Sequence, residues 1–257
     1  MSRIKNAFAN NNKAFIAFLT AGDPSIDKTE EFIYKLIEGG ADLIEIGIPF
    51  SDPIAEGAVI QSANIRSLSG GTRIKNVFEL VARVRKNTQI PLVFLTYMNT
   101  VFKYGTEEFF RKCSETGIDG IIIPDLPFEE KGEIKEPANK YGVDIISLIA
   151  PTSENRIKLI AQESEGFVYV VSSMGVTGMR SEIKTDLKSI TESVRKYTDN
   201  PIAIGFGINS PEQAEKYSKI ADGVIVGSAI VKIIEQHREN SGEYLKEYAN
   251  KMKSAMI

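Results

Sequence analysis

Strand and helix patterns alternate along the whole sequence, and this alternation constrains the fold more than any other feature. Eight short apolar segments, each suited to a buried strand, are separated by segments with apolar residues at helical spacing. The predicted strands cover residues 14–19, 43–48, 91–95, 120–123, 144–149, 167–171, 201–204 and 223–226. Eight strand–helix units with short connections predict an α/β fold, namely a (β/α)8 TIM barrel.

Extra helices are expected at both ends of this barrel, a short amphipathic one within residues 1–13 and a closing one from residue 242 onward. A length of 257 residues fits either two ordinary domains or one α/β barrel. No linker interrupts the pattern, so we expect one TIM-barrel domain over residues 1–257. A doubly wound open sheet is the alternative, but Gly22-Asp23-Pro24 is not the glycine-rich dinucleotide turn that it would usually carry.

Composition excludes several classes of protein. The net charge is -3, and no basic block is interleaved with aromatic residues, so nothing indicates nucleic-acid binding. No apolar run approaches the ~18 residues of a membrane span, and the polar N-terminal segment is unlike a signal peptide. The expected location is cytoplasmic.

The chain has one cysteine, Cys113, and one histidine, His237. These counts exclude a disulfide framework and a Cys/His zinc site, and we expect no metal. Ser-His and Cys-His nucleophiles are disfavoured, because His237 stands near the end of a late helix. No lysine lies within a strand, which argues against Schiff-base chemistry. Any general acid or base must therefore be an Asp, Glu, Tyr or Lys side chain.

The second strand carries a carboxylate, Glu45, inside an otherwise apolar run. Burying a carboxylate is costly unless it is paired or functional. A second carboxylate, Glu56, follows in the loop after this strand. Two carboxylates at the C-terminal end of a barrel strand suit proton transfer. The alternative is that Glu45 caps a neighbouring element and Glu56 is merely solvated.

The ends of the last two strands suggest an anion site. Gly205-Phe206-Gly207 and Gly227-Ser228 both stand where a strand passes into a helix. Glycines let backbone N–H groups approach an anion closely, and the helix that begins at Ser228 aims its free N–H groups at the same place. Barrels commonly bind phosphate there. Alternatively, the glycines only ease tight turns.

Apolar side chains near the C-terminal ends of the strands are placed to enclose a flat ring. They are Phe18, Leu95, Ile122, Leu148, Tyr169 and Phe206. Such residues otherwise fill the barrel core. Together with the carboxylates and the anion site, they indicate a phosphorylated aromatic or heterocyclic metabolite as the ligand.

A further carboxylate, Asp125, lies in Pro124-Asp125-Leu126-Pro127 after the fourth predicted strand. Three roles are open for it: it orients another group, contacts a partner or caps the following helix.

The same motifs resemble those of the tryptophan synthase alpha chain family over essentially the whole chain. The long segment from Glu45 to Pro53 is highly specific, whereas the glycine loops alone would not be. The other matching segments are Leu19-Thr20-Ala21-Gly22-Asp23-Pro24, Pro124-Asp125-Leu126-Pro127, Gly175-Val176-Thr177-Gly178, Gly205-Phe206-Gly207-Ile208 and Gly227-Ser228-Ala229-Ile230-Val231-Lys232.

The resemblance implies a carbon–carbon lyase that cleaves indole-3-glycerol phosphate to indole and glyceraldehyde 3-phosphate. It makes Glu45 the catalytic group at the indole C3 and the glycerol hydroxyl, with Glu56 and Tyr169 beside it. It gives the remaining positions as follows: indole pocket Phe18, Leu95, Ile122, Leu148 and Phe206; phosphate site Gly178, Gly207, Gly227 and Ser228; lid Thr177 with the loop to Thr185; partner-facing surface Asp52 and Asn99.

The resemblance also implies a partner, a tryptophan synthase beta chain, in an α2β2 heterotetramer for tryptophan biosynthesis. That partner holds pyridoxal phosphate and condenses the indole with serine. The chain itself is expected to need no cofactor.

One departure from the family pattern concerns the second carboxylate. The family has an aspartate in Ala-Asp-Gly-Pro, whereas this chain has Ala55-Glu56-Gly57-Ala58. The side chain is one methylene longer, and a misplacement of about 1 Å can cost on the order of 10²-fold in rate. We hypothesise that Glu56 still faces the indole nitrogen, with activity reduced but not absent.

Other functions remain as alternatives at this stage. One is a sugar-phosphate isomerase or epimerase on the same kind of barrel, although the segment from Glu45 to Asp52 and the lack of histidine or metal ligands argue against it. Another is a ligand-binding regulatory subunit with weak or no turnover because of Glu56. A standalone indole-3-glycerol-phosphate lyase is the third.

Overall fold

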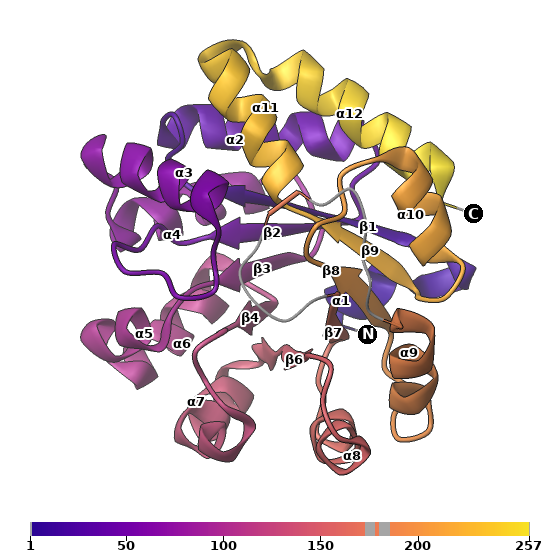
Figure 1. Cartoon of the computed structure of the whole chain (residues 1–257). Coiled ribbons are helices and arrows are strands. Elements are labelled where there is room, and N and C mark those ends of the chain that lie inside the picture. The colour runs from indigo at the N-terminus through magenta and orange to yellow at the C-terminus, as the bar shows by residue number, and fades with distance from the viewer. Residues whose placement is uncertain (1, 173–177, 180–185, 257) are drawn as a thin grey trace.

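The strands are all parallel and form one sheet that curls into a barrel in this computed structural model, which describes residues 2–172, 178–179 and 186–256. Figure 1 shows the strands gathered at the centre with the helices outside them. The strands are β1 (Ala14–Thr20), β2 (Leu43–Gly47), β3 (Leu92–Leu95), β4 (Gly120–Ile122), β5 (Asp144–Ile145), β6 (Ser147–Ile149), β7 (Val168–Val171), β8 (Ile202–Gly205) and β9 (Gly223–Val226).

Helices follow the strands and cover the barrel. The α-helices are α1 (Arg3–Ala7), α2 (Ile26–Glu38), α3 (Ala58–Ser69), α4 (Ile74–Arg85), α5 (Met98–Tyr104), α6 (Thr106–Thr116), α7 (Gly132–Tyr141), α8 (Glu154–Gln162), α9 (Leu187–Arg195), α10 (Pro211–Ser218), α11 (Ser228–His237) and α12 (Gly242–Ala255). Short 3-10 turns are η1 (Ala9–Asn11), η2 (Phe128–Glu130) and η3 (Arg238–Asn240).

The sheet order confirms the predicted barrel and places β1 between β2 and β9, so the first and last strands are neighbours. All seven residues of β1 are buried, as expected for a parallel strand that is covered on both faces. The core continues outward through the apolar faces of the helices, for example Phe32, Ile33 and Leu36 of α2. The (β/α)8 architecture therefore follows from the alternation in the sequence.

The fifth predicted strand is divided in the structure. It consists of β5, which pairs with β4, and β6, which pairs with β7. Ile146 separates the two pieces, and its N–H still donates to the carbonyl of Ile121 at 2.9 Å. The barrel is thus closed along a bent strand.

The region after β3 differs from the prediction. A single helix is expected over residues 107–115, but the chain forms two, α5 and α6, joined at Gly105. Gly105 has a φ of 90°, a conformation that favours glycine and lets the chain turn sharply between them. Asn99 consequently lies in the first turn of α5.

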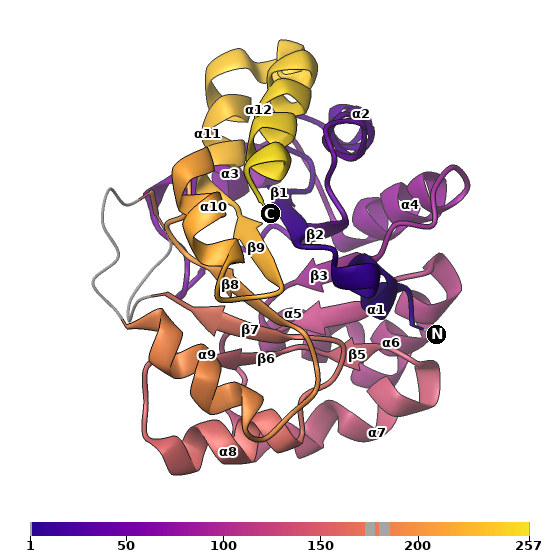
Figure 2. The same cartoon turned by 90° about the vertical axis from the view of Figure 1, so that its right-hand side faces the viewer.

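Both extra terminal helices are present. α1 lies at the end of the barrel where the strands begin (Figure 2), and its Ile4 is fully buried. α12 packs against α2 and α10. Lys253 of α12 is 2.7 Å from Asp42, which precedes β2, so the closing helix is also held by charge.

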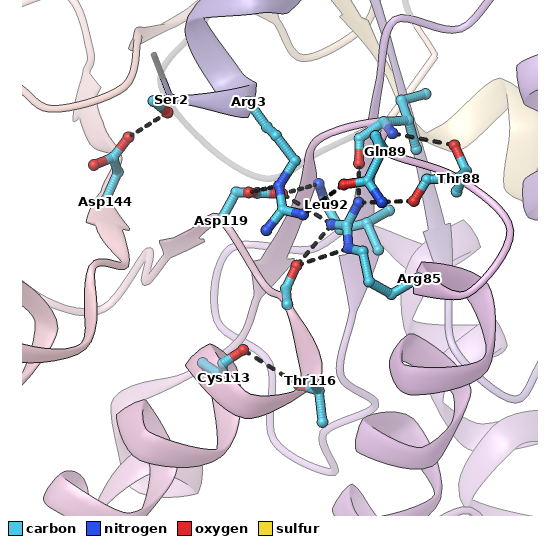
Figure 3. Close-up of polar contacts among 12 residues, drawn as sticks. Ser2, Arg3, Arg85, Thr88, Gln89, Leu92, Cys113, Thr116, Asp119 and Asp144 are labelled. Carbon is cyan, nitrogen blue, oxygen red and sulfur yellow. Dashed lines mark hydrogen bonds and ion pairs between the residues drawn. The ribbon is translucent and has the colours of Figure 1, made fainter.

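Carboxylates tie the strands together at the end where the strands begin. Asp119, just before β4, accepts a hydrogen bond from the N–H of Leu92 in β3 at 2.8 Å. Arg3 and Arg85 both bind this carboxylate, at 2.6 and 3.0 Å (Figure 3). The same arrangement recurs where Asp42 accepts from Phe15, Asp222 from Ile202 and Glu165 from Ile145. These contacts set the register of the barrel, because each fixes one strand against the next.

Candidate active site

A cavity with an empty volume of about 580 Å³ opens at the C-terminal ends of the strands. This is the end at which barrel enzymes carry their active sites. Its lining residues are Phe18, Glu45, Ala55, Glu56, Ile60, Leu95, Pro124, Leu148, Tyr169, Phe206, Gly207, Ile208, Ile225, Gly227 and Ser228. Ten of the residues singled out in the sequence are thus brought to one cavity from separate parts of the chain.

Glu45 lies in the middle of β2, between Phe18 of β1 and Val93 of β3. Its side chain is only 2% exposed, and its Oε2 atom has no hydrogen-bond partner among the described residues. Burial, with a smaller contribution from Glu56, raises the pKa of Glu45 to about 8. At neutral pH this group is therefore protonated and able to donate a proton.

Glu56 lies in the loop between β2 and α3 and faces the same cavity. Its Oε2 accepts a hydrogen bond from Asn64 Nδ2 at 2.6 Å. Burial raises its pKa to about 7, while hydrogen bonds from Asn64 and Tyr97 act in the opposite direction. Glu56 is thus neither a solvated loop residue nor excluded from the site by its extra methylene.

Aromatic and aliphatic side chains form the walls between these carboxylates and the last strands. The rings of Tyr169 and Phe206 meet edge to face, with centroids 5.9 Å apart. Gly205 leaves room for this tyrosine, since a Cβ there would lie 2.6 Å from the Tyr169 Cζ. Gly47 likewise admits Phe18, whose ring would lie 2.8 Å from an added Cβ. Leu95 and Leu148 complete the wall.

Part of the cavity wall is formed by backbone after β8 and at the start of α11. Phe206 and Gly207 have φ values of 73° and 89°, so the chain turns through two left-handed residues after β8. This conformation is strained for phenylalanine and is typical of functional sites. Gly227 caps α11, and Ser228 is its first residue. The free N–H groups at that helix N-terminus favour an anion.

Several predicted residues lie elsewhere. Ile122 is fully buried and does not line the cavity; it belongs to the same core cluster as Tyr169. Gly178 is described but is not a lining residue, and Thr177 lies outside the described residues. Asp52 and Asn99 are both exposed and stand outside the cavity.

The sequence alone did not single out Asn64 or Tyr97, which contact the Glu56 segment. Asn64 stands one helical turn after Ile60, and this spacing puts both side chains on the cavity side of α3. Tyr97 follows Leu95 by two residues. Because residues two apart in an extended segment lie on the same face, this spacing could have indicated that Tyr97 points inward like Leu95. Asp125 does not cap the helix that follows it. Instead its two oxygens accept from the N–H of Met98 at 3.0 and 3.2 Å.

Two general features bear on cofactors and location. Within residues 2–172, 178–179 and 186–256, no group of three or more His, Cys, Asp or Glu side chains is arranged to hold a metal ion. None of the helices in this described part of the chain is long and apolar enough to cross a membrane.

The buried Glu45 predicts a pH-dependent stability. Its pKa is about 8 in the folded chain against an ordinary 4.5, so folding favours the protonated form and stability falls as pH rises through this range. Each pH unit removes up to about 1.4 kcal/mol. Between about pH 6 and pH 8, we expect the unfolding free energy of the wild type to fall by roughly 2 kcal/mol more than that of Glu45→Gln.

Urea unfolding of both proteins across this pH range measures the difference. The exposed Glu136→Gln is the control that removes one carboxylate without removing a buried one. Parallel pH profiles for the wild type and Glu45→Gln would contradict the prediction.

Fold and cavity together define a class, the (β/α)8-barrel enzymes that combine buried carboxylates with an anion-binding helix N-terminus. Comparison with known proteins then identifies the family. The sequence profile of the tryptophan synthase alpha chain matches residues 4–256. The alpha chain of Lacticaseibacillus casei is 46% identical over 256 residues, covering 100% of this chain and 96% of the relative.

Solved structures agree with this assignment. A structure from Aquifex aeolicus VF5 matches with a TM-score of 0.92 and 36% identity, covering 100% of this chain and 99% of the other. A chain from a Pyrococcus furiosus tryptophan synthase α2β2 complex matches with a TM-score of 0.86 and 35% identity, covering 93% and 97%. The chain belongs to the tryptophan synthase alpha chain family. It is a lyase, and the family reaction is cleavage of indole-3-glycerol phosphate.

Proposed function

We propose that Glu45 and Glu56 together carry out the retro-aldol cleavage of indole-3-glycerol phosphate. Glu45 gives its proton to the indole C3. The bond between C3 and the glycerol carbon then breaks, and its electron pair returns to the ring. The hydroxyl on the departing carbon gives its proton to the now ionised Glu45 carboxylate and becomes the aldehyde of glyceraldehyde 3-phosphate, so Glu45 ends the cycle protonated. One observation carries this proposal: Glu45 is buried in the same cavity as Glu56, and its Oε2 atom has no hydrogen-bond partner in the described part of the chain.

Glu56 has a different role in this proposal. Protonation at C3 places positive charge on the indole N1–H, and an ionised carboxylate beside it stabilises that charge. The apolar walls exclude water and strengthen the interaction. Phe18, Leu95, Leu148 and Phe206 hold the ring, with Tyr169 packed against Phe206 and close to Glu45. Ile122 supports this wall without reaching the cavity.

Gly207, Gly227 and Ser228 are assigned to the phosphate. The left-handed turn after β8 and the N-terminus of α11 both line the cavity. Backbone N–H groups at such a place bind phosphate without a lysine or arginine. Gly178 is proposed to belong to the phosphate site, and Thr177 to the lid.

The partner is proposed to be a tryptophan synthase beta chain in an α2β2 complex, as in the Pyrococcus furiosus relative. Asp52 and Asn99 are exposed near the mouth of the barrel and are assigned to the surface that faces it. Pyridoxal phosphate belongs to that partner, and this chain works without a cofactor. We also assign residues 1–257 to one domain and the protein to the cytoplasm.

Indole release from indole-3-glycerol phosphate, measured with and without a beta chain, tests this function. Release that is strong only with the beta chain is the expected result. Strong release by the chain alone would instead favour a standalone lyase. If neither mixture released indole while glyceraldehyde 3-phosphate still bound, the regulatory alternative would replace the proposal. Family membership and the position of Glu56 in the cavity favour turnover.

A further inference from the structure

Two side chains from different elements position Glu56, one through its carboxylate and one through the residue before it. Asn64 of α3 donates from Nδ2 to Glu56 Oε2 at 2.6 Å. The hydroxyl of Tyr97, between β3 and α5, accepts from the N–H of Ala55 at 3.1 Å, and it lies close enough to the Glu56 carboxylate to lower its pKa. Gln61 Nε2 donates to the main-chain oxygen of Glu56 at 2.6 Å, which fixes the backbone as well. Hydrogen bonds therefore fix the positions of both the backbone and the carboxylate of Glu56.

The two holding side chains are themselves fixed. Asn64 is 3% exposed and Tyr97 is 1% exposed, so neither exchanges freely with water. The Tyr97 ring stacks on Phe50, with centroids 5.0 Å apart and planes 23° apart. On the other side, Asp125 binds the N–H of Met98, the residue that follows Tyr97. A buried donor of this kind sets the position of its acceptor, because losing the bond leaves a buried polar group unpaired.

The position of Glu56 matters because its side chain is one methylene longer than the aspartate in the family pattern. We propose that Asn64 and Tyr97 are positioning residues, which fix the longer Glu56 carboxylate in the cavity so that it faces the developing charge on the substrate. We call this pair the Glu56 frame. The inference rests on the proposed function, since it assigns Glu56 a task in that reaction.

The electrostatics of the cavity support the same role. The titratable groups around Glu56 are Glu45 from β2 and Tyr97 from the segment after β3, and Tyr97 itself is influenced by Asp125. Burial raises the pKa of Glu56 to about 7, and only the hydrogen bonds from Asn64 and Tyr97 oppose it. Without the frame, the pKa of Glu56 would rise, and a smaller fraction of its carboxylate would be ionised at neutral pH. The frame thus controls both where this carboxylate lies and how much of it carries charge.

The test uses the full chain assembled with a beta chain, and it measures kcat and KM for indole release across pH. Tyr97→Phe and Asn64→Ala are each expected to lower kcat by roughly 10- to 100-fold, the usual effect of losing a hydrogen bond to a charged group. KM is expected to stay within about threefold, and the acid limb of the kcat profile is expected to move to higher pH. Tyr104→Phe, the same change at the end of α5, is the matched control and is expected to match the wild type.

A second measurement does not depend on turnover. The ionisation of Glu56, followed by carbon NMR of selectively labelled glutamate, is expected to shift to higher pH in Asn64→Ala. Wild-type kcat profiles and an unchanged Glu56 titration in both frame variants would overturn the frame alone. A wild-type complex that releases no indole would overturn the proposed function instead, and the NMR titration would still decide the frame. Tyr97→Phe keeps the ring, so it decides the outcome if Asn64→Ala fails to fold.

Discussion

Replacing Glu45 with glutamine is expected to lower kcat for indole release by on the order of 10³-fold or more. Glutamine keeps the shape and burial of the side chain but has no proton to transfer to the indole C3. Since Glu45 Oε2 has no hydrogen-bond partner among the described residues, the exchange breaks no structural contact of that atom. The loss therefore reports chemistry rather than folding.

Steady-state indole release by the complex with a beta chain measures this effect. Glu136→Gln, on the exposed side of α7, is the control for loss of one negative charge. Binding of glyceraldehyde 3-phosphate by calorimetry is expected to stay close to the wild-type value, because the backbone proposed to bind the phosphate is unchanged. If Glu45→Gln remained active, the prediction would be wrong, and the acid–base role would have to be assigned to Glu56 or Tyr169.

Removing the Asp119 side chain is expected to cost the largest amount of stability, about 3–5 kcal/mol for Asp119→Ala. This carboxylate is 9% exposed and binds Arg3, Arg85 and the N–H of Leu92 (Figure 3). Without it, the poorly exposed Arg85 loses its carboxylate partner, and β3 and β4 lose a contact that fixes their register. Leaving one buried charge uncompensated is more costly than losing an exposed ion pair.

Urea unfolding followed by circular dichroism measures the loss. Asp222→Ala is the matched control, because Asp222 also binds an arginine and the N–H of the preceding strand, but its ion pair is more exposed. We expect it to cost roughly 1 kcal/mol. Equal losses at both positions would show that burial of the ion pair is not what matters.

The family relationship explains why the sequence was informative about chemistry. The segment from Glu45 to Pro53 combines a buried carboxylate with a loop that carries the second one, and the structure brings both into one cavity. Their roles in catalysis stay predictions. The exchange of aspartate for glutamate at position 56 was visible in the sequence, but its consequence was not, because Asn64 and Tyr97 approach it from other elements.

Local pattern by itself determined the alternation of strands and helices, the parallel barrel and the residues at the C-terminal strand ends. This succeeds because hydrophobic periodicity and glycine placement act over a few neighbouring residues. Tertiary structure alone decided which inward side chains reach the cavity, which Leu95 does and Ile122 does not. It also decided that Asp125 binds the start of α5 rather than its own following helix, and that Glu56 is held by α3 and Tyr97. These contacts join residues far apart in the chain, so their distances depend on how the barrel closes rather than on any local pattern.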